Sequence, residues 1–454
     1  MAEPLLSDTQ AERRLDAVAD ALDTGALHRV RQILGAMNPA EIAHLLESLP
    51  AGQRLFVWRL VDPDDAGEVL VHVGDEVRAG LLRETDKDTL LAAAEVMETD
   101  DLADLLSELP DAVTRELLQS MDRRDRERVE AVLSYDEDTA GGLMNTDTIT
   151  VRADVTLDVV LRYLRMRGEI PEGTDSLFVV DRYDTYLGTL PLTTILTEDV
   201  DQRVADVMDT SVEGIPADMP ATEVAKLFED RDLISAPVVD QHGHLLGRIT
   251  IDDVVDVIRE EADHEVLSMA GLSEEEDIFA PVLPSARRRA VWLGVNLVTA
   301  FVASWVISLF EGTIQKVVAL AVLMPIVASM GGIAGTQTLT LVVRALALGQ
   351  VARANTQALL WKELAVGAIN GLFWAFIVGL ASAVWFDDPG IGWIIGAAMV
   401  INLLCAAFAG AVIPLLLRAI GVDPALAGGV VLTTITDVVG FMAFLGLATL
   451  FLVR

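Results

Sequence analysis

Five long apolar stretches that follow Arg289 constrain this chain more than any other feature. They cover roughly residues 290–310, 317–343, 361–386, 391–417 and 425–453. Each is at least as long as the ~20 residues that a helix needs to cross the hydrocarbon core of a bilayer. Lipid cannot satisfy backbone hydrogen bonds, so each stretch is expected to be helical. The sequence therefore predicts a polytopic α-helical membrane domain with five spans.

Charge divides the chain where these stretches begin. Nine of the 33 Lys and Arg residues and six of the 69 Asp and Glu residues lie from Arg287 onward, which leaves 24 basic and 63 acidic residues before it. The first part is polar and long enough for about two soluble domains. It offers no basic surface, so we expect no nucleic-acid partner. Halophilic organisms carry acidic surfaces on proteins of every function, so the excess alone does not establish cation binding.

The flanking charges predict an orientation in the cell membrane. Met1 is followed by acidic and polar residues rather than by a basic and apolar stretch, so no signal peptide is expected. Most basic residues near the spans flank the ends expected to be cytoplasmic, whereas Lys316 and Arg454 fall on the other side. We expect a multi-pass protein with cytoplasmic N-terminal domains and an extracytoplasmic C-terminus. The single Cys405 allows no intrachain disulfide.

Residues 5–133 are rich in helix formers and contain a repeated phrase. The segment Ala43–Pro50 (AHLLESLP) returns sixty residues later as Ala103–Pro110 (ADLLSELP). Leucine pairs at helical spacing that end at a proline predict short stacked helices in an all-α superhelical domain. Such an array is typical of an interaction or sensing surface.

Residues 143–260 contain a second duplication with α/β character. The strand Phe178–Asp181 is matched by Pro237–Asp240, and each unit is predicted to contain a short strand, a helix and two strands joined by a polar turn. This arrangement resembles a tandem pair of CBS domains. The resemblance implies a site for ATP or another adenine nucleotide, with ribose contacts from Thr250 and Asp253. The first unit has Pro191 and Thr194 at the equivalent places and is expected to have lost that ability.

An acidic helical segment, residues 252–271, connects this region to the first span. Asp252, Asp256 and Glu260 lie four residues apart, and like charges at that spacing destabilise an isolated helix. A divalent cation that bridges these carboxylates to acids elsewhere would remove the repulsion. A solvated helix face is the alternative. The segment leads through Pro281 and Pro284 into the first span.

The last apolar stretch contains one carboxylate, Asp437, near its middle. An ionised Asp at the centre of a membrane helix costs about 2.5–3.5 kcal/mol on insertion scales. Such residues usually face a wet cavity on an ion or proton path. The alternative is an acid that stabilises helix packing through hydrogen bonds to neighbouring hydroxyls.

The order of these features resembles the MgtE family of magnesium channels along nearly the full length of the chain. The matching motifs are Gly247–Val254, Met330–Gln337, Arg344–Ala347, Lys362-Glu363, Gly421–Leu426 and Thr436-Asp437. The resemblance implies a superhelical regulatory domain (1–135), tandem CBS domains (136–251), an acidic connecting helix and linker (252–284) and a five-helix pore domain (285–454).

The resemblance also implies a function and a set of ion sites. The expected protein is a homodimer in a lipid bilayer that takes up Mg²⁺ selectively, is closed by Mg²⁺ bound between its cytosolic domains, and is not an enzyme. In the pore, Asp437 would bind hydrated Mg²⁺, with the hydroxyls of Thr433 and Thr436 near the same level. The regulatory Mg²⁺ ligands would be Asp253, Asp256, Glu261 and Glu265.

Two positions depart from the family pattern around the pore. The pattern Gly-Gly-Asn in the second span is Gly331-Gly332-Ile333 here, and a position in the last span that often carries Asn is Gly429. Both changes remove polar side chains expected to line the pore or its gate. They leave Asp437 as the main polar anchor for the ion.

Two other functions stay open on the sequence. A transporter for Co²⁺, Mn²⁺ or Ni²⁺ often uses His, Cys or Met ligands. None of the six histidines lies in a span, and the sequence shows no cluster of metal ligands. A membrane sensor regulated by CBS domains is the other alternative. A P-loop or nucleophile elbow, which would favour an enzyme, is absent.

Overall fold

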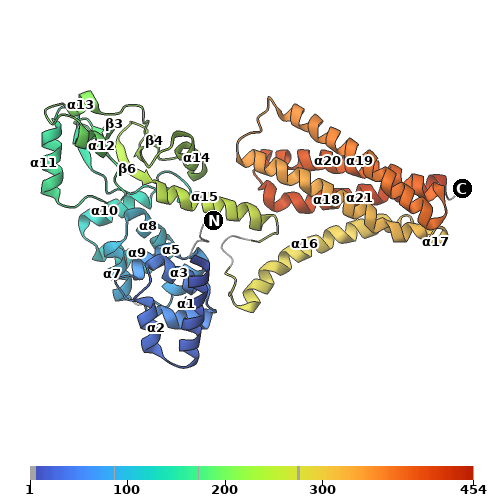
Figure 1. Cartoon of the computed structure of the whole chain (residues 1–454), viewed down its shortest axis with the longest axis horizontal. Helices are drawn as coiled ribbons and strands as arrows, with labels where there is room; N and C mark the ends of the chain where they lie inside the picture. Colours follow the sequence, from blue (N-terminus) through green and yellow to red (C-terminus); the bar gives the residue numbers. More distant parts are fainter. Residues whose placement is uncertain (1–6, 86, 172, 273–276, 453–454) are drawn as a thin grey trace. The chain divides into compact units, whose positions relative to one another are not determined.

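The computed structural model describes residues 7–85, 87–171, 173–272 and 277–452 and divides the chain into two compact units (Figure 1). Unit 1 comprises Met1–Asp263 and Glu275–Pro281, and unit 2 comprises His264–Glu274 and Val282–Arg454. Unit 1 holds the helical and α/β regions, and unit 2 holds the long apolar helices. This division follows the change in charge and hydropathy along the sequence.

Short helices build the first part of unit 1, as the repeated phrase predicts. Asn38 caps α3 through a capping box: its Oδ1 accepts from the Glu41 amide at 2.8 Å, and the Glu41 carboxylate accepts from the Asn38 amide at 3.1 Å. Helices α3 and α8 carry the two copies of the phrase, and both end shortly before its proline. The described helices are α1 (Ser7–Asp23), α2 (Leu27–Leu34), α3 (Pro39–Glu47), α4 (Ala51–Trp58), α5 (Ala66–His72), α6 (Asp75–Leu82), α7 (Lys87–Val96), α8 (Thr99–Ser107), α9 (Asp111–Ser120) and α10 (Arg123–Val132).

The α/β region contains two copies of one motif, which confirms the predicted duplication. In each three-stranded sheet, the first strand is parallel to the second and the second is antiparallel to the third. The first copy contains β1 (Thr150–Arg152), α11 (Leu157–Arg167), β2 (Ser176–Val180), β3 (Tyr186–Pro191) and α12 (Leu192–Thr197). A short helix, α13 (Val204–Val207), precedes the second copy, which contains β4 (Ile215–Pro216), α14 (Ala221–Arg231), β5 (Ser235–Val239), β6 (Leu245–Thr250) and α15 (Ile251–Ser268).

One hydrophobic core joins the helical part of unit 1 to the second α/β copy. It runs from Val18 in α1 through Leu106 in α8 to Ile249 in β6 and Val254 in α15. The first copy has a separate small core around Leu177. Because α8 and the start of α15 pack on the same core, their polar faces come together although some 150 residues separate them in sequence.

Unit 2 contains the five predicted spans. They are α16 (Val282–Ser308), α18 (Ala319–Ala347), α19 (Thr356–Phe386), α20 (Pro389–Ala419) and α21 (Pro424–Phe451), each long and apolar enough to cross a membrane. A short helix, α17 (Glu311–Lys316), joins the first two. The predicted stretches coincide with these helices to within a few residues, except that α16 begins earlier. Arg454, which the charge argument places beyond the last span, lies outside the described residues.

Small residues allow the helices of unit 2 to approach closely. A Cβ added at Gly335 of α18 would lie 2.9 Å from a methyl group of Leu432 in α21, and one at Gly428 would lie 2.9 Å from a methyl group of Leu339. One at Gly410 of α20 would lie 2.7 Å from the Gly335 carbonyl oxygen. Such contacts are typical of helix packing in membranes. They also fix α18 and α21 as antiparallel neighbours.

Candidate ion sites

The carboxylate of Asp437 is half-buried near the middle of α21. Within the described residues, no side chain or backbone group lies within hydrogen-bond or ion-pair distance of it. A carboxylate at this depth without a partner is energetically costly. Asp437 therefore does not stabilise the packing of this single chain through hydrogen bonds, which is what the packing alternative requires.

The hydroxyls around Asp437 bond to their own helix. Thr433 donates to the carbonyls of Gly429 and Val430 at 3.0 and 3.1 Å, and Thr436 donates to the Thr433 carbonyl at 3.1 Å. Such bonds satisfy Ser and Thr side chains in apolar helices. Thr433 is exposed, so its oxygen can still accept from a hydrated ion. Thr436 is fully buried in the bundle, so of these two threonines only Thr433 presents its hydroxyl on an open surface.

Glu363 in α19 provides a direct comparison, because it is the other acid within the five long helices. It is buried, and its two carboxylate oxygens accept from the Thr338 hydroxyl at 3.2 Å and from the Lys362 ammonium at 2.8 Å. These bonds compensate the burial of its charge. Glu363 is thus a packing acid, whereas Asp437 lacks such partners.

The predicted gate residues fall into two groups. A Cβ at Gly331 would lie 2.2 Å from Nδ2 of the buried Asn402, so Gly331 is needed for helix packing. Gly332 and Gly429 have open space where a Cβ would be, and Ile333 is 55% exposed. These three residues are placed where they can line a surface.

The register of α18 against α21 sets the level of Ile333. Gly331 and Gly440 both approach Asn402, and Gly335 approaches Leu432. Residues between Gly331 and Gly335 therefore lie opposite residues between Leu432 and Gly440. The apolar Ile333 is consequently at the level of Asp437, near the middle of both helices.

A cavity of about 170 Å³ in unit 1 collects acidic side chains from three segments. The α5–α6 segment contributes Asp75, α8 contributes acids one turn apart, and α15 contributes acids from its first three turns. Two arginines, Arg78 and Arg259, also line it. The seven acids are Asp75, Asp100, Asp101, Asp104, Asp253, Asp256 and Glu260.

Burial and the charges of neighbouring acids raise the pKa values of several of these carboxyls. Burial, with the charges of Glu98 and Asp252, raises the pKa of Asp101 to about 6. Burial is also the main cause that raises the pKa of Asp104 to about 7, with Arg78 opposing the shift. For Asp253, burial and the adjacent Asp252 raise the pKa to about 7.

Asp100 is the most constrained member of the group. It is only 4% exposed, and burial followed by the charge of Asp253 raises its pKa well above the ordinary value. Among the described residues, no group makes a hydrogen bond of normal geometry to its carboxylate oxygens. Arg78 does not compensate it, because its guanidinium bonds to Asp75 and Glu108, both at 2.5 Å.

The cavity suits a hydrated divalent cation. Its volume is large enough for several water molecules. Its carboxylate oxygens do not form a group of three within 4.8 Å in the described residues, so they are too far apart to chelate one bare ion together. Mg²⁺ retains several waters and is commonly bound through carboxylates. An all-oxygen donor set around a buried, unpaired Asp100 fits such an ion.

The predicted regulatory residues divide between this cavity and other surfaces. Asp253 and Asp256 line it. Glu261 and Glu265 do not, because at 100° per residue they are turned by about 80° and 120° from Asp253 around α15. Glu261 is exposed in unit 1, and Glu265 belongs to unit 2. Their assignment as ligands stays a prediction.

The two residues predicted to contact a ribose bond to each other. The Thr250 hydroxyl and amide donate to Oδ2 of Asp253 at 2.9 and 3.1 Å, at the junction of β6 and α15. Thr250 is buried. Asp253 also lines the acidic cavity, so one carboxylate serves two predicted sites. The nucleotide site likewise stays a prediction.

Two groups of residues were not recognised from the sequence. Asp100, Asp101 and Asp104 lie at or just before the start of one copy of the repeated leucine phrase, where an acidic face at i, i+1 and i+4 is visible. The second group is a candidate cluster of metal ligands. Asp240, His242 and His244 place three potential ligand atoms within 4.8 Å of one another.

Known proteins resemble the chain over nearly all of its length. Family profiles match residues 37–138 (MgtE intracellular N domain), 140–201 and 204–260 (CBS domain) and 324–447 (MgtE, divalent cation transporter). The Magnesium transporter MgtE of Thermus thermophilus is 32% identical over 446 residues, covering 97% of this chain and 99% of that protein. The chain belongs to the MgtE family.

Other MgtE proteins are also similar to the chain. The Magnesium transporter MgtE of Bacillus subtilis is 27% identical over 431 residues, and the alignment covers 95% of this chain and 96% of that protein. The solved cytosolic domain of the Mg²⁺ channel MgtE in complex with ATP covers 54% of this chain and 99% of that domain, with 34% identity and a TM-score of 0.49. As an MgtE protein, the chain is a multi-pass membrane protein with a soluble N-terminal region, and its relatives are transporters.

Proposed function

We propose that this MgtE protein transports Mg²⁺ across the cell membrane through a pore lined by Asp437. The observation that carries the proposal is the half-buried, unpartnered carboxylate in the middle of α21. An ion path explains why such an acid is kept, since the passing cation supplies the missing partner. The magnesium transporters of T. thermophilus and B. subtilis support Mg²⁺ as the ion.

We further propose that two chains form the pore. One Asp437 per chain becomes two carboxylates around a two-fold axis, which match the charge of a dication. Thr433, exposed one turn before Asp437, would supply a hydroxyl to the hydration shell. Mg²⁺ sheds water reluctantly, so a pore can select it through carboxylate and hydroxyl contacts to retained waters. With five spans, the C-terminus would lie on the side of the membrane opposite to unit 1.

The same ion is proposed to close the channel by binding in the acidic cavity. Without a cation, the cavity holds a buried, unpaired Asp100 next to Asp101 and Asp253, all with raised pKa values. Bound Mg²⁺ would offset that repulsion and stabilise the packing of α8 against α15. Low Mg²⁺ would loosen the packing, and α15 leads toward the first span. Mg²⁺ can shift this equilibrium only because it binds the packed arrangement better than the loosened one.

The decisive experiment measures Mg²⁺ flux into proteoliposomes. The full chain should pass Mg²⁺, and Asp437→Asn, which keeps the size of the side chain, should reduce flux to that of empty vesicles. Glu311→Gln is the matched control, because it removes one negative charge from an exposed residue of the same unit. It should conduct like the natural chain. Undiminished flux in Asp437→Asn would refute the pore assignment.

A second candidate, transport of other divalent cations, is favoured by one observation. The exposed Ile333 lies at the level of Asp437, where an apolar side chain cannot hydrogen-bond to a hydration shell. Selection for Mg²⁺ would then rest on fewer contacts. Flux assays in which Co²⁺, Mn²⁺ or Ni²⁺ competes with Mg²⁺ distinguish the two, since a selective pore should be little affected by equal concentrations of these ions.

For the CBS pair, we infer that ATP or another adenine nucleotide would use Thr250 and Asp253. Support comes from the two side chains lying together at the end of β6. Isothermal titration with ATP should show binding to the full chain and loss of binding in Thr250→Val, which keeps the shape of the side chain but removes its hydroxyl. Equal binding by both proteins would exclude this site.

A further inference from the structure

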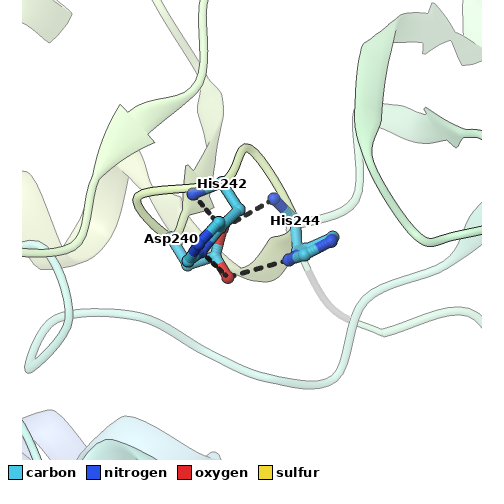
Figure 2. A group of neighbouring side chains, drawn as sticks. All are labelled: Asp240, His242 and His244. Atoms are coloured by element: carbon cyan, nitrogen blue, oxygen red, sulfur yellow. Dashed lines mark hydrogen bonds and ion pairs between the residues drawn. The ribbon is translucent and has the colours of Figure 1, made fainter.

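A turn in the second CBS copy brings two imidazoles against one carboxylate. Asp240, His242 and His244 lie between β5 and β6 (Figure 2). The Nδ1 atoms of His244 and His242 lie 2.9 and 3.7 Å from Oδ2 of Asp240. The two rings are 5.9 Å apart between centroids and inclined by 27°. The cluster belongs to neither the acidic cavity nor the spans.

The backbone of the turn orients the carboxylate. Oδ1 of Asp240 accepts from the amides of His242 and His244 at 2.7 and 2.9 Å. These bonds occupy one carboxylate oxygen and leave Oδ2 to face the rings, as Figure 2 shows. Second-shell bonds of this kind commonly hold metal ligands in place.

The matching turn of the first CBS copy shows what is special about this one. Asp181 accepts from the amides of Tyr183 and Thr185 at 2.7 and 3.0 Å, so the two turns have the same construction. Tyr183 and Thr185 stand where the second copy has His242 and His244. The first turn therefore has the same oriented carboxylate but no imidazoles. Because the turn forms without histidines, the two imidazoles are not needed to build it.

The two turns also support each other. The Tyr186 amide donates to the Gly243 carbonyl at 2.9 Å, and the Leu245 amide donates to the Asp184 carbonyl at 3.0 Å. Gly243 has a φ of +83°, which favours glycine at that position. The histidines are thus carried by a turn that is fixed from both sides, and sites on rigid supports lose little entropy on binding.

The distances suit a tetrahedral transition-metal ion. Zn²⁺ binds imidazole nitrogen and carboxylate oxygen at about 2.0–2.2 Å, which separates tetrahedral ligand atoms by about 3.3 Å. The observed 2.9 and 3.7 Å bracket that value, and all three ligand atoms lie within 4.8 Å. The His242 side chain is 78% exposed, so its ring can rotate to close the remaining gap. Three protein ligands leave a fourth position for water.

We propose that Asp240, His242 and His244 form a binding site for Zn²⁺ or a similar borderline transition-metal ion on the CBS pair. Imidazole nitrogen favours Zn²⁺, Ni²⁺, Co²⁺ and Cu²⁺, whereas Mg²⁺ takes oxygen ligands. The site therefore distinguishes transition metals from the ion proposed for the pore and the acidic cavity. It lies outside the spans and is independent of the transport function.

The test uses the full chain in detergent with a large excess of Mg²⁺, which occupies sites made of carboxylates alone. Zn²⁺ binding is measured by isothermal titration, and Co²⁺ binding by the visible absorption of tetrahedral Co²⁺. We expect one ion per chain. His242→Gln and His244→Gln should each weaken binding at least tenfold, which is about the lower end of what losing even a second-shell partner costs. His28→Gln, an exposed histidine in α2, is the control and should bind normally.

Two further variants separate the metal site from a merely structural turn. Asp240→Asn keeps an oxygen to accept the two backbone amides, so it should fold with an unchanged melting temperature and still lose Zn²⁺ affinity. The double variant Tyr183→His, Thr185→His should bind a second ion, because Asp181 has the same orientation. Binding that is unaffected by Asp240→Asn, His242→Gln and His244→Gln, or no second ion in the double variant, would overturn the proposal.

Discussion

The acidic cavity of unit 1 and the α21 carboxylate of unit 2 place negative charge in poorly solvated surroundings in different ways. In the cavity, seven acids share the space with two arginines, and burial raises several of their pKa values. In α21, Asp437 stands alone without a partner in the described chain. Many repelling carboxylates favour a bound ion that holds surfaces together, whereas a single carboxylate per chain allows an ion to pass.

For binding Mg²⁺, the number of carboxylates at a site matters less than whether each carboxylate already has a hydrogen-bond or ion-pair partner. Glu363 is buried in unit 2, but its bonds to Thr338 and Lys362 satisfy it. Asp100 and Asp437 lack such bonds. We therefore expect these two acids, and not Glu363, to respond to Mg²⁺.

Asp100→Asn gives the largest expected effect among the tests of this comparison. Without Mg²⁺ at pH 7.5 it should raise the melting temperature of unit 1, because it replaces a buried carboxyl, whose ionised form has no partner, by a neutral amide. It should also raise the Mg²⁺ concentration needed for half-maximal protease protection of the full chain by about tenfold or more, which corresponds to about 1.4 kcal/mol.

The control for Asp100→Asn is Glu130→Gln, which removes one charge from an exposed position of α10. It should change neither the melting temperature nor the Mg²⁺ response. If Asp100→Asn behaved in the same way, Asp100 would not be part of the cation site, and the distinction between partnered and unpartnered acids would lose its main support.

A pH titration tests the cavity as a whole. The folded-state pKa values of Asp101, Asp104 and Asp253 are raised to about 6, 7 and 7, so the packed cavity binds more protons than the unfolded chain between about pH 4 and pH 7. Their contribution to stability is complete below the ordinary Asp pKa and is lost as the pH rises through 6 to 7. Differential scanning fluorimetry without Mg²⁺ should show a melting temperature that falls from pH 5 to pH 8.

Excess Mg²⁺ should flatten that profile, because the bound ion stabilises the ionised carboxylates. In a domain of this size, the melting temperature is expected to change by about 2–4 °C for each kcal/mol of change in the free energy of unfolding. A melting temperature that rises with pH in the absence of Mg²⁺ would contradict the assignment of these acids to a repelling cavity.

Glu363→Gln tests the partnered acid. The amide oxygen can still accept from Thr338, but the charge-assisted bond from Lys362 is lost, so unit 2 should lose about 1–3 kcal/mol of stability. Mg²⁺ flux per folded molecule should be retained. Thermal unfolding in detergent and flux in proteoliposomes measure the two quantities. Loss of flux in well-folded Glu363→Gln would mean that both span acids serve the pore.

Ile333→Asn should have the smallest effect. It restores a polar side chain at the level of Asp437, which should change the preference for Mg²⁺ over Co²⁺ or Mn²⁺ by a few-fold without abolishing flux. Ile333→Leu, which stays apolar, is the matched control. Identical selectivity in both variants would show that Ile333 does not face the ion.

Much of the fold could be predicted from local patterns. The five spans, the two CBS copies with their strand–helix order and the helices carrying the repeated leucine phrase all follow from hydropathy and periodicity within short windows. The site was predicted in part. Asp253 and Asp256 were named as regulatory ligands through the family resemblance, and both line the cavity. The acids of α8 that meet them there were not recognised, because they lie in a distant segment.

The sequence by itself determined the five membrane helices, the isolated carboxylate in the last of them and the family, since hydropathy and motif order are properties of the chain alone. Tertiary structure decided which acids are alone and which have partners. It places Asp100 beside Asp253, although some 150 residues separate them in sequence. It also places the Thr338 hydroxyl where it donates a hydrogen bond to Glu363. It also turns Asp240 toward His242 and His244. Burial and partner distance set the energy of a charge, and both are fixed only when distant segments pack.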